Sequence, residues 1–314
     1  MVPRTADARI AILLSTFNGE AYLREQLQSL LAQTYGNWVL YWRDDGSDDG
    51  TVAIMETFAQ QAGQGRCVAI AAAGTRLGVT GSFFALLRAV HGQLSEADAV
   101  AFADQDDVWL PEKLARGIAA LTALPASVPV LYCARQVLVD ARLKQLAPSG
   151  PVARWPGFPA SLTQNIATGC TVMLNRAAAG LVAASTPSST ALHDWWCYLM
   201  VTAAGGQVVQ DDEPVVLYRQ HAGNLVGAPA SMTRRALAAL RRGPGVFMNV
   251  LRQNVAALAQ QPHLLSEQAR AEVTAIDRAL SGRGTARLAA LRMPGLHRQT
   301  WPETLLFRWW FLIG

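Results

Sequence analysis

The sequence predicts an α/β fold in which helices cover both faces of a mostly parallel central sheet. Three observations support this prediction. Short apolar runs alternate with stretches of helical periodicity in the first hundred residues. The apolar runs are almost uninterrupted, as in strands that are buried on both faces. Finally, 51% of the 314 residues are hydrophobic, which provides the large core that such a fold needs.

The first half of the chain contains most of the expected sheet. We expect strands over 10–15, 38–42, 68–72 and 99–103, and helices over 21–32, from about 51 to 62, and over 82–90. In the first helix, Leu23, Leu27, Leu30 and Leu31 fall on one face. Ligands of such sheets bind beyond the carboxyl ends of the strands, so polar residues that directly follow a strand are the first candidates for a site.

The second half is more mixed. Strands are expected over 130–133, 171–174 and 215–218, and a helix over 194–204. The segment 227–229 (Gly-Ala-Pro) marks a domain boundary, after which helices are expected over 235–260, 264–281 and 284–292. The sequence therefore predicts an α/β domain over 1–229 and a helical extension over 230–314.

Charge is distributed unevenly between these two parts. Residues 1–229 carry 15 basic and 19 acidic side chains, whereas residues 230–314 carry 12 arginines and 4 acidic side chains. Basic amphipathic helices with Trp and Phe near one end suit the surface of an anionic bilayer. The alternative is a helical cap whose arginines are solvated. Because no aromatic-studded basic groove is visible, a nucleic acid is not expected as a partner.

Cysteine spacing and hydropathy give expectations about the compartment. The four cysteines are scattered without metal-binding spacing, and we expect reduced, mostly buried thiols in a cytosolic protein: Cys67, Cys133, Cys170 and Cys197. No 18 apolar residues occur in a row, so no membrane span is expected, and no signal peptide is recognised at the N-terminus.

The strongest chemical signal is the acidic cluster Asp104-Gln-Asp-Asp107, directly after the strand expected at 99–103. Carboxylates two residues apart on such a turn can converge on a hard cation, Mg²⁺ or Mn²⁺, which prefers oxygen ligands. We therefore expect Asp104 and Asp106 to hold a metal ion that neutralises a diphosphate. The alternative is an acidic turn that caps the helix starting near Pro111.

Two further motifs follow the first two strands. A carboxylate at Asp45 can accept the N3–H of a uracil or thymine ring, although an Asp-Gly turn is the alternative at this position. Exposed backbone and hydroxyl groups after the first strand can meet a nucleotide, and Phe17 can stack on its base. The candidates for nucleotide contact are Ser15, Thr16, Phe17, Asn18, Glu20, Asp45 and Asp104.

Asp194 is the candidate general base. It belongs to the motif His193-Asp-Trp-Trp196, where it lies among aromatic residues at the expected start of a helix. Apolar walls raise the pKa of Asp194 and a helix N-terminus lowers it, so the net shift stays open. Trp195 or Trp196 can form a platform for a sugar face. Thr168 and Gly169 are expected to shape the acceptor side.

Two groups near the end of the first part leave alternatives open. His221 can complete a metal sphere, although a lone histidine is more often structural. Arg219 and Gln220 are candidates for diphosphate or acceptor contact without being preferred. The run Asp211-Asp-Glu213 is expected to be a solvated turn rather than a second metal site.

Taken in order, STFNGE, LLAQTY, DDGSDDGT and DQDDVWLPEKL resemble the family 2 glycosyltransferases of GT-A fold over residues 9–124. The motifs at 167–170, 193–196 and 218–221 extend the resemblance to about 229. These motifs are most similar to the rhamnosyltransferase branch of surface polysaccharide synthesis, including O-antigen. One departure is Ser82-Phe83, where that branch usually has Asn-Phe.

The resemblance implies that Ser15, Phe17 and Asp45 hold the nucleotide, that Asp104 and Asp106 serve metal and diphosphate, and that Asp194 is the base. It implies an inverting, metal-dependent transfer of L-rhamnose from dTDP-rhamnose to a glycan or lipid-linked acceptor at the cytoplasmic membrane face. A UDP-hexose or UDP-N-acetylhexosamine transferase is the alternative donor class. A nucleotidyltransferase and a non-catalytic sugar-nucleotide-binding protein are the alternatives from other classes.

Overall fold

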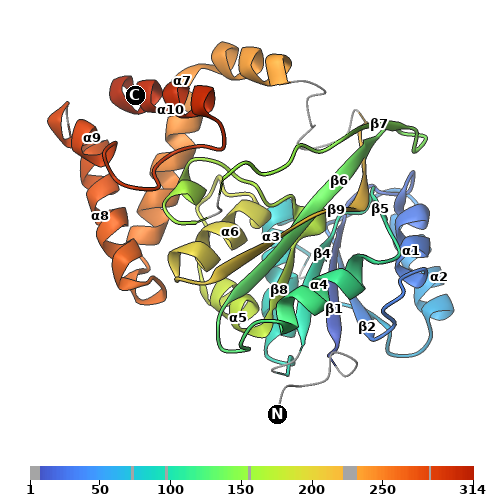
Figure 1. Ribbon diagram of the computed structural model, residues 1–314. Coiled ribbons are helices and arrows are strands. Elements are labelled where there is room, and N and C mark those ends of the chain that lie inside the picture. The colour runs from blue at the N-terminus through green and yellow to red at the C-terminus, as the bar shows by residue number, and fades with distance from the viewer. Residues whose placement is uncertain (1–7, 72–73, 96–97, 155–156, 222–231, 283) are drawn as a thin grey trace.

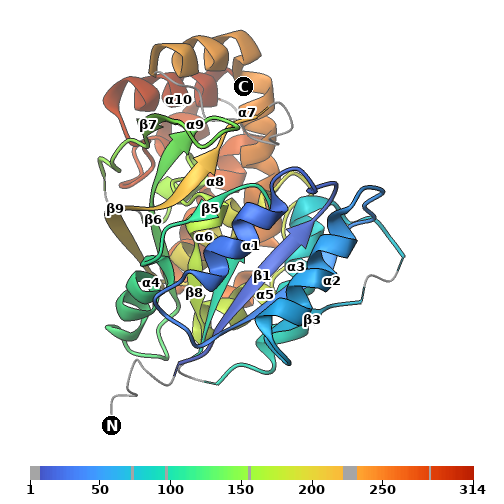
Figure 2. The ribbon, with the colours of Figure 1, turned by 90° about the vertical axis from the view of Figure 1, so that its right-hand side faces the viewer.

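The computed structural model describes residues 8–71, 74–95, 98–154, 157–221, 232–282 and 284–314, with the backbone alone for 232–242. A nine-stranded sheet lies at the centre of this part (Figures 1 and 2), in the order β3-β2-β1-β4-β8-β6-β9-β5, with β7 paired to β6. The strands are β1 (Ile10–Thr16), β2 (Trp38–Asp44), β3 (Cys67–Ala69), β4 (Ala99–Ala103), β5 (Val108–Trp109), β6 (Val130–Val139), β7 (Gln145–Pro148), β8 (Met173–Asn175) and β9 (Gln207–Arg219).

The expected α/β fold with a mostly parallel sheet is confirmed. Strands β3, β2, β1 and β4 run parallel to one another, and β6 runs parallel to β9. The short strand β8 is antiparallel to both β4 and β6 and so joins the two parallel parts. Strands β5 and β7 pair antiparallel with β9 and β6.

Alternate residues of each central strand enter different hydrophobic cores. In β1, Ile10, Ile12 and Leu14 pack on one face, and Ala11 and Leu13 pack on the other. This double burial explains why the strand is apolar at almost every position. One face is covered by α1 (Leu23–Leu31), α2 (Thr51–Ala62) and α4 (Lys113–Thr122), and the other by α3 (Gly78–His91), α5 (Arg176–Ala184) and α6 (His193–Ala203).

Strand β9 is much longer than its expected core at 215–218. It pairs with β6 over most of its length, and the register shifts near Arg135 let it accommodate the polar residues Asp211, Asp212 and Glu213. The expected turn at 211–213 is therefore wrong. The local sequence carries no strand signal at these positions, and the strand forms there because β9 pairs with β6. Polar residues are tolerated in a strand where the pairing is irregular and their side chains are exposed.

The C-terminal part is helical, as expected, and contains α7 (Met232–Ala259), α8 (Glu267–Ser281), α9 (Thr285–Ala290) and α10 (Trp301–Ile313). Helix α7 is kinked at Gly243, whose φ of 72° is left-handed, and Pro244 follows directly. Buried residues of these helices, including Leu251, Ile276 and Phe307, belong to the same hydrophobic core as α3, α5 and α6. The extension thus packs on the sheet-containing part as one body. The expected boundary at 227–229 lies outside the described residues.

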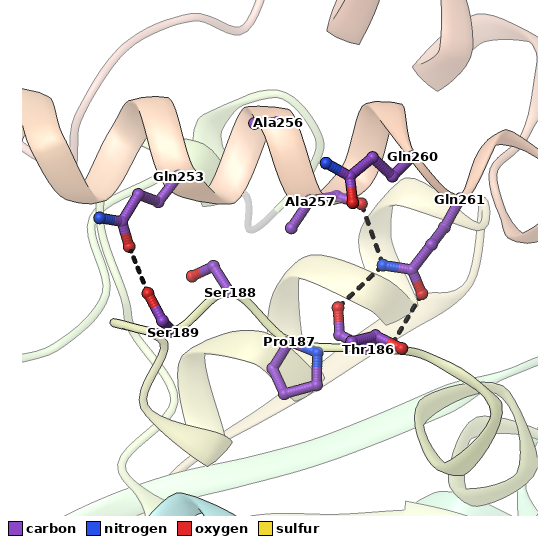
Figure 3. Close-up of a pocket in the computed structure, with 9 residues that line it drawn as sticks. All are labelled: Thr186, Pro187, Ser188, Ser189, Gln253, Ala256, Ala257, Gln260 and Gln261. Atoms are coloured by element: carbon purple, nitrogen blue, oxygen red, sulfur yellow. Dashed lines mark hydrogen bonds between the residues drawn. The ribbon is translucent and has the colours of Figure 1, made fainter.

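Polar contacts accompany this shared core where α7 meets the segment after α5 (Figure 3). The side chain of Gln261 accepts a hydrogen bond from the backbone N–H of Thr186 at 2.7 Å and donates to its carbonyl at 2.8 Å. Ser189 donates to Gln253 at 3.0 Å. The hollow between them, about 450 Å³, is lined by none of the residues that the sequence singled out as a site.

Cys133, Cys170 and Cys197 are buried and Cys67 is half-buried, and each is a free thiol. Among the described residues, no helix combines the length and apolar character needed to cross a bilayer.

Candidate active site

The candidate site lies where β1, β2 and β4 end. The register of β1 against β4 brings Ser15 and Asp104 to the edge of the sheet together. Thr16 lies opposite Asp44 of β2, and its hydroxyl donates to the Asp44 carboxylate at 2.9 Å. The parallel topology therefore collects motifs that are far apart in the chain at one edge, as expected.

Gln105 joins the loops that follow β1 and β4. Its Oε1 accepts from the backbone N–H of Phe17 at 2.9 Å, and its Nε2 donates to the Phe17 carbonyl, also at 2.9 Å. The Phe17 ring lies 3.6 Å from the guanidinium carbon of Arg76. This role of Gln105 could not be predicted from the sequence, because an amide between two carboxylates carries no signal for such a bridge.

Asn18 and Glu20 connect the first loop to the loop after β2. The backbone N–H of Asn18 donates to the Ser47 hydroxyl at 2.9 Å, and its side-chain oxygen accepts from the N–H of Asp48 at 3.0 Å. Glu20 accepts from the N–H of Gly50 at 3.0 Å. These exposed side chains shape the loops of the site, and their contact with a nucleotide stays a prediction.

Asp45 is buried just beyond β2. One of its oxygens accepts from Arg43 at 2.6 Å and from the N–H of Leu77 at 2.7 Å, and the other accepts from the N–H of Gly78 at 2.7 Å. Arg43 also donates to the Ser82 hydroxyl at 2.6 Å. Burial acts to raise the pKa of Asp45, but Arg43 and the two N–H groups outweigh it, so the pKa is lowered. Asp45 is thus an ionised anchor for the start of α3. Recognition of a pyrimidine ring by Asp45 stays a prediction.

Asp106 and His221 lie close together although they are far apart in the chain. The Asp106 Oδ2 atom and the His221 Nε2 atom are 2.8 Å apart, and both side chains are partly exposed. The ring of His221 also packs on Tyr22 with 4.7 Å between centroids. A carboxylate beside an imidazole provides two of the ligand types that a divalent cation accepts.

Negative charge accumulates around this pair. Burial, followed by the charges of Asp106 and Asp194, raises the pKa of Asp104 to about 7. Burial and the charges of Asp104 and Asp106 likewise raise the pKa of Asp107. Two features therefore favour a bound cation: the clustered carboxylates, and one oxygen of Asp107 that has no hydrogen-bond partner among the described residues.

Asp104, Asp107 and Cys170 form a second grouping, with one ligand atom of each lying within 4.8 Å of the others. Burial raises the pKa of the Cys170 thiol well above its usual value, so the sulfur is protonated and a poor partner for a hard cation. Asp104 belongs to this grouping and is also one of the metal ligands expected from the sequence. The residues present thus fit Mg²⁺ or Mn²⁺.

Lys113 lies beside the acidic cluster, a position that the local sequence did not predict. Its side chain is fully buried, its Nζ atom has no hydrogen-bond partner within the described ranges, and it lies 3.3 Å from the centre of the Trp109 ring. Burial lowers the pKa of Lys113 to about 7, while the nearby Asp107 and Asp104 act in the opposite direction. A lysine that follows Pro-Glu at the start of a helix is expected to be exposed to solvent. The burial of Lys113 is therefore apparent only from the packing of α4.

Arg219 holds the acidic turn in place. Only 1% of Arg219 is exposed, and its backbone N–H donates to Asp107 at 3.0 Å. Its guanidinium donates to the carbonyls of Asp106 at 2.7 Å and Ala141 at 2.6 Å and forms an ion pair with Glu25. These contacts make Arg219 a positioning residue, so the alternative of diphosphate contact by its side chain is not supported.

Asp194 lies in the first turn of α6 at the same edge of the sheet. One of its oxygens accepts from the N–H of Gly169 at 3.0 Å and the other from the N–H of Trp195 at 2.6 Å. Burial has the largest effect and raises the pKa of Asp194 to about 6, although the N–H groups act to lower it. The structure therefore decides the sign that the sequence left open.

His193 explains the glycine at position 169. The imidazole is stacked on Phe83 with 4.1 Å between centroids and lies 5.3 Å from Phe102, and burial lowers the pKa of His193 to about 3. A Cβ atom at Gly169 would lie 2.8 Å from the His193 Nε2 atom. Only a glycine lets the backbone approach this neutral imidazole and bind Asp194.

The two tryptophans beside Asp194 differ. Trp195 is partly exposed, and its indole N–H donates to the Ser161 carbonyl at 2.7 Å. Trp196 is fully buried in the core, and its N–H donates to the Ser185 hydroxyl. The expectation that Trp196 could present a platform to a sugar is wrong, because the helical turn points successive residues in different directions. Thr168 is partly exposed and accepts from Gln136 at 3.1 Å.

Asp211 serves the structure rather than a metal ion. Its carboxylate accepts two hydrogen bonds of 2.7 Å from Arg116 and one of 2.9 Å from the Tyr132 hydroxyl. Arg116 and Tyr132 thus occupy the oxygens that a second metal ion would need.

Known proteins are similar to this chain in sequence and in architecture. A family model described as "Glycosyl transferase family 2" matches residues 11–179. The dTDP-rhamnosyl transferase RfbG of Shigella flexneri is 28% identical over 233 residues, which cover 69% of this chain and 75% of RfbG. The Escherichia coli enzyme named UDP-Glc:alpha-D-GlcNAc-diphosphoundecaprenol beta-1,3-glucosyltransferase WfgD is 28% identical over 108 residues, covering 34% of this chain and 39% of WfgD.

Among solved structures, residues 1–349 of S. aureus TarS, in complex with UDP-GlcNAc, superpose with a TM-score of 0.58 at 15% identity. The match covers 87% of this chain and 72% of that one, and shows that the two share a fold. The family match spans more than half of the chain and includes the motifs that end β1, β2 and β4. The chain belongs to glycosyl transferase family 2 and is a glycosyltransferase.

Proposed function

We propose that this glycosyltransferase moves L-rhamnose from dTDP-L-rhamnose to a hydroxyl of a lipid-linked or polysaccharide acceptor, with inversion. The strongest support for this proposal is that four side chains lie near one another at one edge of the sheet: Asp194, Asp104, Asp106 and His221. A base and a cation site must flank the transferred sugar in such a reaction. The similarity to RfbG, named a dTDP-rhamnosyl transferase, favours the rhamnosyl donor.

Asp194 is the base in this proposal. Its carboxylate takes the proton of the acceptor hydroxyl while the hydroxyl oxygen bonds to the anomeric carbon and the bond from that carbon to the diphosphate oxygen breaks. The electron pair of that bond leaves with the nucleoside diphosphate. Gly169 and Trp195 orient the carboxylate through their N–H groups. Attack opposite the leaving group inverts the anomeric centre.

Asp104, Asp106 and His221 would hold Mg²⁺ or Mn²⁺. The cation, when bound, neutralises the charge that develops on the departing diphosphate. Arg219 fixes the turn that carries the two carboxylates. Nucleotide contacts are proposed for the loop residues Ser15, Thr16, Phe17, Asn18 and Glu20 and for Asp45, and acceptor contacts for Thr168, Gly169 and Trp195.

A UDP-hexose is the second candidate donor, because the similar enzyme WfgD carries UDP-Glc in its name. Thymine and uracil share the N3–H edge, so Asp45 does not separate the two nucleotides. With a lipid-linked acceptor, the enzyme would work at the cytoplasmic face of the membrane, without a nucleic acid partner.

A donor panel tests the proposal. Thermal melts and donor hydrolysis are measured with dTDP-rhamnose, UDP-glucose, UDP-galactose and UDP-N-acetylglucosamine, each with Mn²⁺ or Mg²⁺. We expect dTDP-rhamnose to raise the melting temperature most and to be hydrolysed fastest. A clear preference for a UDP-hexose would reject the rhamnosyl donor and favour the second candidate. If the enzyme hydrolysed no donor of the panel, both the rhamnosyl donor and the UDP-sugar donors would be rejected.

A further inference from the structure

The last helix exposes an apolar face that the rest of the described structure does not cover. In α10, Trp301, Leu305, Trp309 and Leu312 are 66%, 45%, 53% and 39% exposed. Their spacing of four, four and three residues places them on one stripe of the helix. Ile313 flanks this stripe and is 58% exposed. We call these five residues the outer face of α10.

The opposite side of α10 is firmly packed. Phe307, Trp310 and Phe311 are buried. Phe247 of α7 contacts Phe307 edge-to-face and Trp310 at a tilt, with 5.9 and 5.7 Å between centroids. Since α10 is apolar on both sides, its outer face is not the solvated side of an ordinary amphipathic helix.

Both ends of α10 are fixed. Thr300 and Glu303 form a capping box at its start. At its end, Arg287 donates to the carbonyls of Phe311 and Leu312 at 3.3 and 3.1 Å, where a cation also opposes the helix dipole. The outer face is therefore presented by a rigid helix rather than by a fraying end.

Charge near this face favours an anionic surface. Residues 285–314 contain four arginines and a single acidic side chain, Glu303, which the capping box uses. Arg308 is exposed on the edge of the outer face, one helical turn before Leu312. Tryptophans beside an arginine, next to leucine and isoleucine, are typical of helices that lie in the headgroup region of a bilayer.

The segment just before α10 is tied to the acceptor side of the candidate site. Gln164 accepts from the N–H of Gln299 at 3.0 Å, and Thr163 donates to the His297 carbonyl at 2.7 Å. Two residues earlier, the carbonyl of Ser161 accepts from the indole of Trp195. One short segment, 161–164, therefore contacts both the residue beside the proposed base and the residues that lead into α10.

The figures agree with this placement. In both views α10 lies near the upper end of the molecule (Figures 1 and 2), and in Figure 2 strand β1 runs upward from the lower end toward the candidate site. We infer that the outer face of α10 inserts into the interfacial region of a lipid bilayer and holds the acceptor side of the site at the membrane. Only the link to a lipid-linked acceptor rests on the proposed function, since the apolar face exists without it.

Vesicle binding tests the inference. The full chain is sedimented with vesicles of phosphatidylcholine alone or mixed with phosphatidylglycerol. The variant Leu305→Ser with Trp309→Ser should bind at least about tenfold more weakly than the wild type, because it removes apolar area from the interface. Leu146→Ser is the matched control, since Leu146 is 55% exposed on β7. Its binding should equal that of the wild type.

Salt separates insertion from charge attraction. Binding through the outer face should persist when salt rises from about 0.1 to about 0.5 M, because screening affects charges and not apolar burial. Binding that needs anionic lipid and disappears at high salt would assign the contact to arginines and overturn the inference. Absence of vesicle binding by the wild type, or equal binding by the double variant, would also overturn it.

Two further measurements complete the design. Sedimentation equilibrium distinguishes a second copy of the chain: if the wild type ignores vesicles and the double substitution abolishes self-association, the outer face is a dimer interface and the inference is wrong. Donor hydrolysis in solution reports on the chemistry alone. The double variant should hydrolyse the donor like the wild type, so a failure of vesicle binding and a failure of the proposed function are told apart.

Discussion

At the scale of single residues, Asp194 combines two opposing influences. Burial disfavours its charge, while the N–H groups of Gly169 and Trp195 favour it. Asp194→Asn keeps the size of the side chain but cannot take a proton. We expect turnover to fall by roughly 10²–10⁴-fold with little change in donor affinity, because the proposed base would face the acceptor. Steady-state kinetics and donor titration measure both; normal turnover by this variant would mean that the base lies elsewhere.

The raised pKa of Asp194 predicts a pH profile. A carboxylate accepts a proton only when ionised, and burial raises the pKa of Asp194 to about 6. Turnover should therefore be full above this pKa and fall as the pH drops through it, with a tenfold loss per pH unit well below it. The rate at saturating donor and acceptor is measured between about pH 5 and pH 8, because folded proteins tend to be most stable in roughly this range. A flat profile across that range would contradict the role of Asp194 as the base.

The pair of Asp106 and His221 predicts dependence on a divalent cation. Turnover should be lost in EDTA and return with Mn²⁺ or Mg²⁺, and Asp106→Ala should abolish it without unfolding the protein, since Asp106 is partly exposed. Asp212→Ala is the control, because Asp212 belongs to the exposed part of β9 and should leave turnover unchanged. Full activity in chelator would rule out the assigned cation site.

At the scale of secondary structure, the end of β9 is held by Arg219. Its guanidinium is buried against two carbonyls and Glu25, and a lysine cannot reach all three with one ammonium group. Arg219→Lys should lower the free energy of unfolding by about 2–4 kcal/mol, because buried carbonyls lose their donors. Urea unfolding measures the change.

Arg116→Lys provides the comparison, because Arg116 of α4 pairs with a carboxylate on the same strand, β9. Arg116 pairs with Asp211 of β9 but is 40% exposed, so its replacement should cost at most about 1 kcal/mol. Equal losses in the two variants would show that Arg219 is no more important to the acidic turn than a surface ion pair.

At the scale of the whole molecule, the helical extension shares its core with the sheet-containing part. Leu251, Ile276 and Phe307 lie in the same cluster as Leu199 and Met200 of α6. Deleting residues 230–314 should expose this apolar surface and leave a chain that aggregates or melts without cooperativity. Circular dichroism melts and gel filtration of the truncated chain check this. A truncated chain that stays monomeric and melts cooperatively would instead support independent domains.

The sequence by itself determined the parallel sheet and the position of the motifs at its edge. Apolar runs such as 10–15 and 99–103 need burial on both faces, which only helices on both sides provide. Carboxyl ends of parallel strands meet, so residues such as Asp104, Asp45 and Ser15 could be assigned to one edge without coordinates. The acidic cluster and Asp194 were found because carboxylates after a buried strand or at a helix start are unusual enough to be noticed.

Only the tertiary structure decided the contacts between distant segments. The burial of Trp196 and Lys113, the clamp by Arg219 and the upward pKa shift of Asp194 depend on which surfaces pack together. The same is true of the outer face of α10, which is apolar in sequence but exposed only because the opposite side of the helix packs. Local periodicity shows which side of a helix or strand faces the core. Burial, ion pairing and desolvation depend instead on which distant segments pack together, and the local sequence does not record that packing.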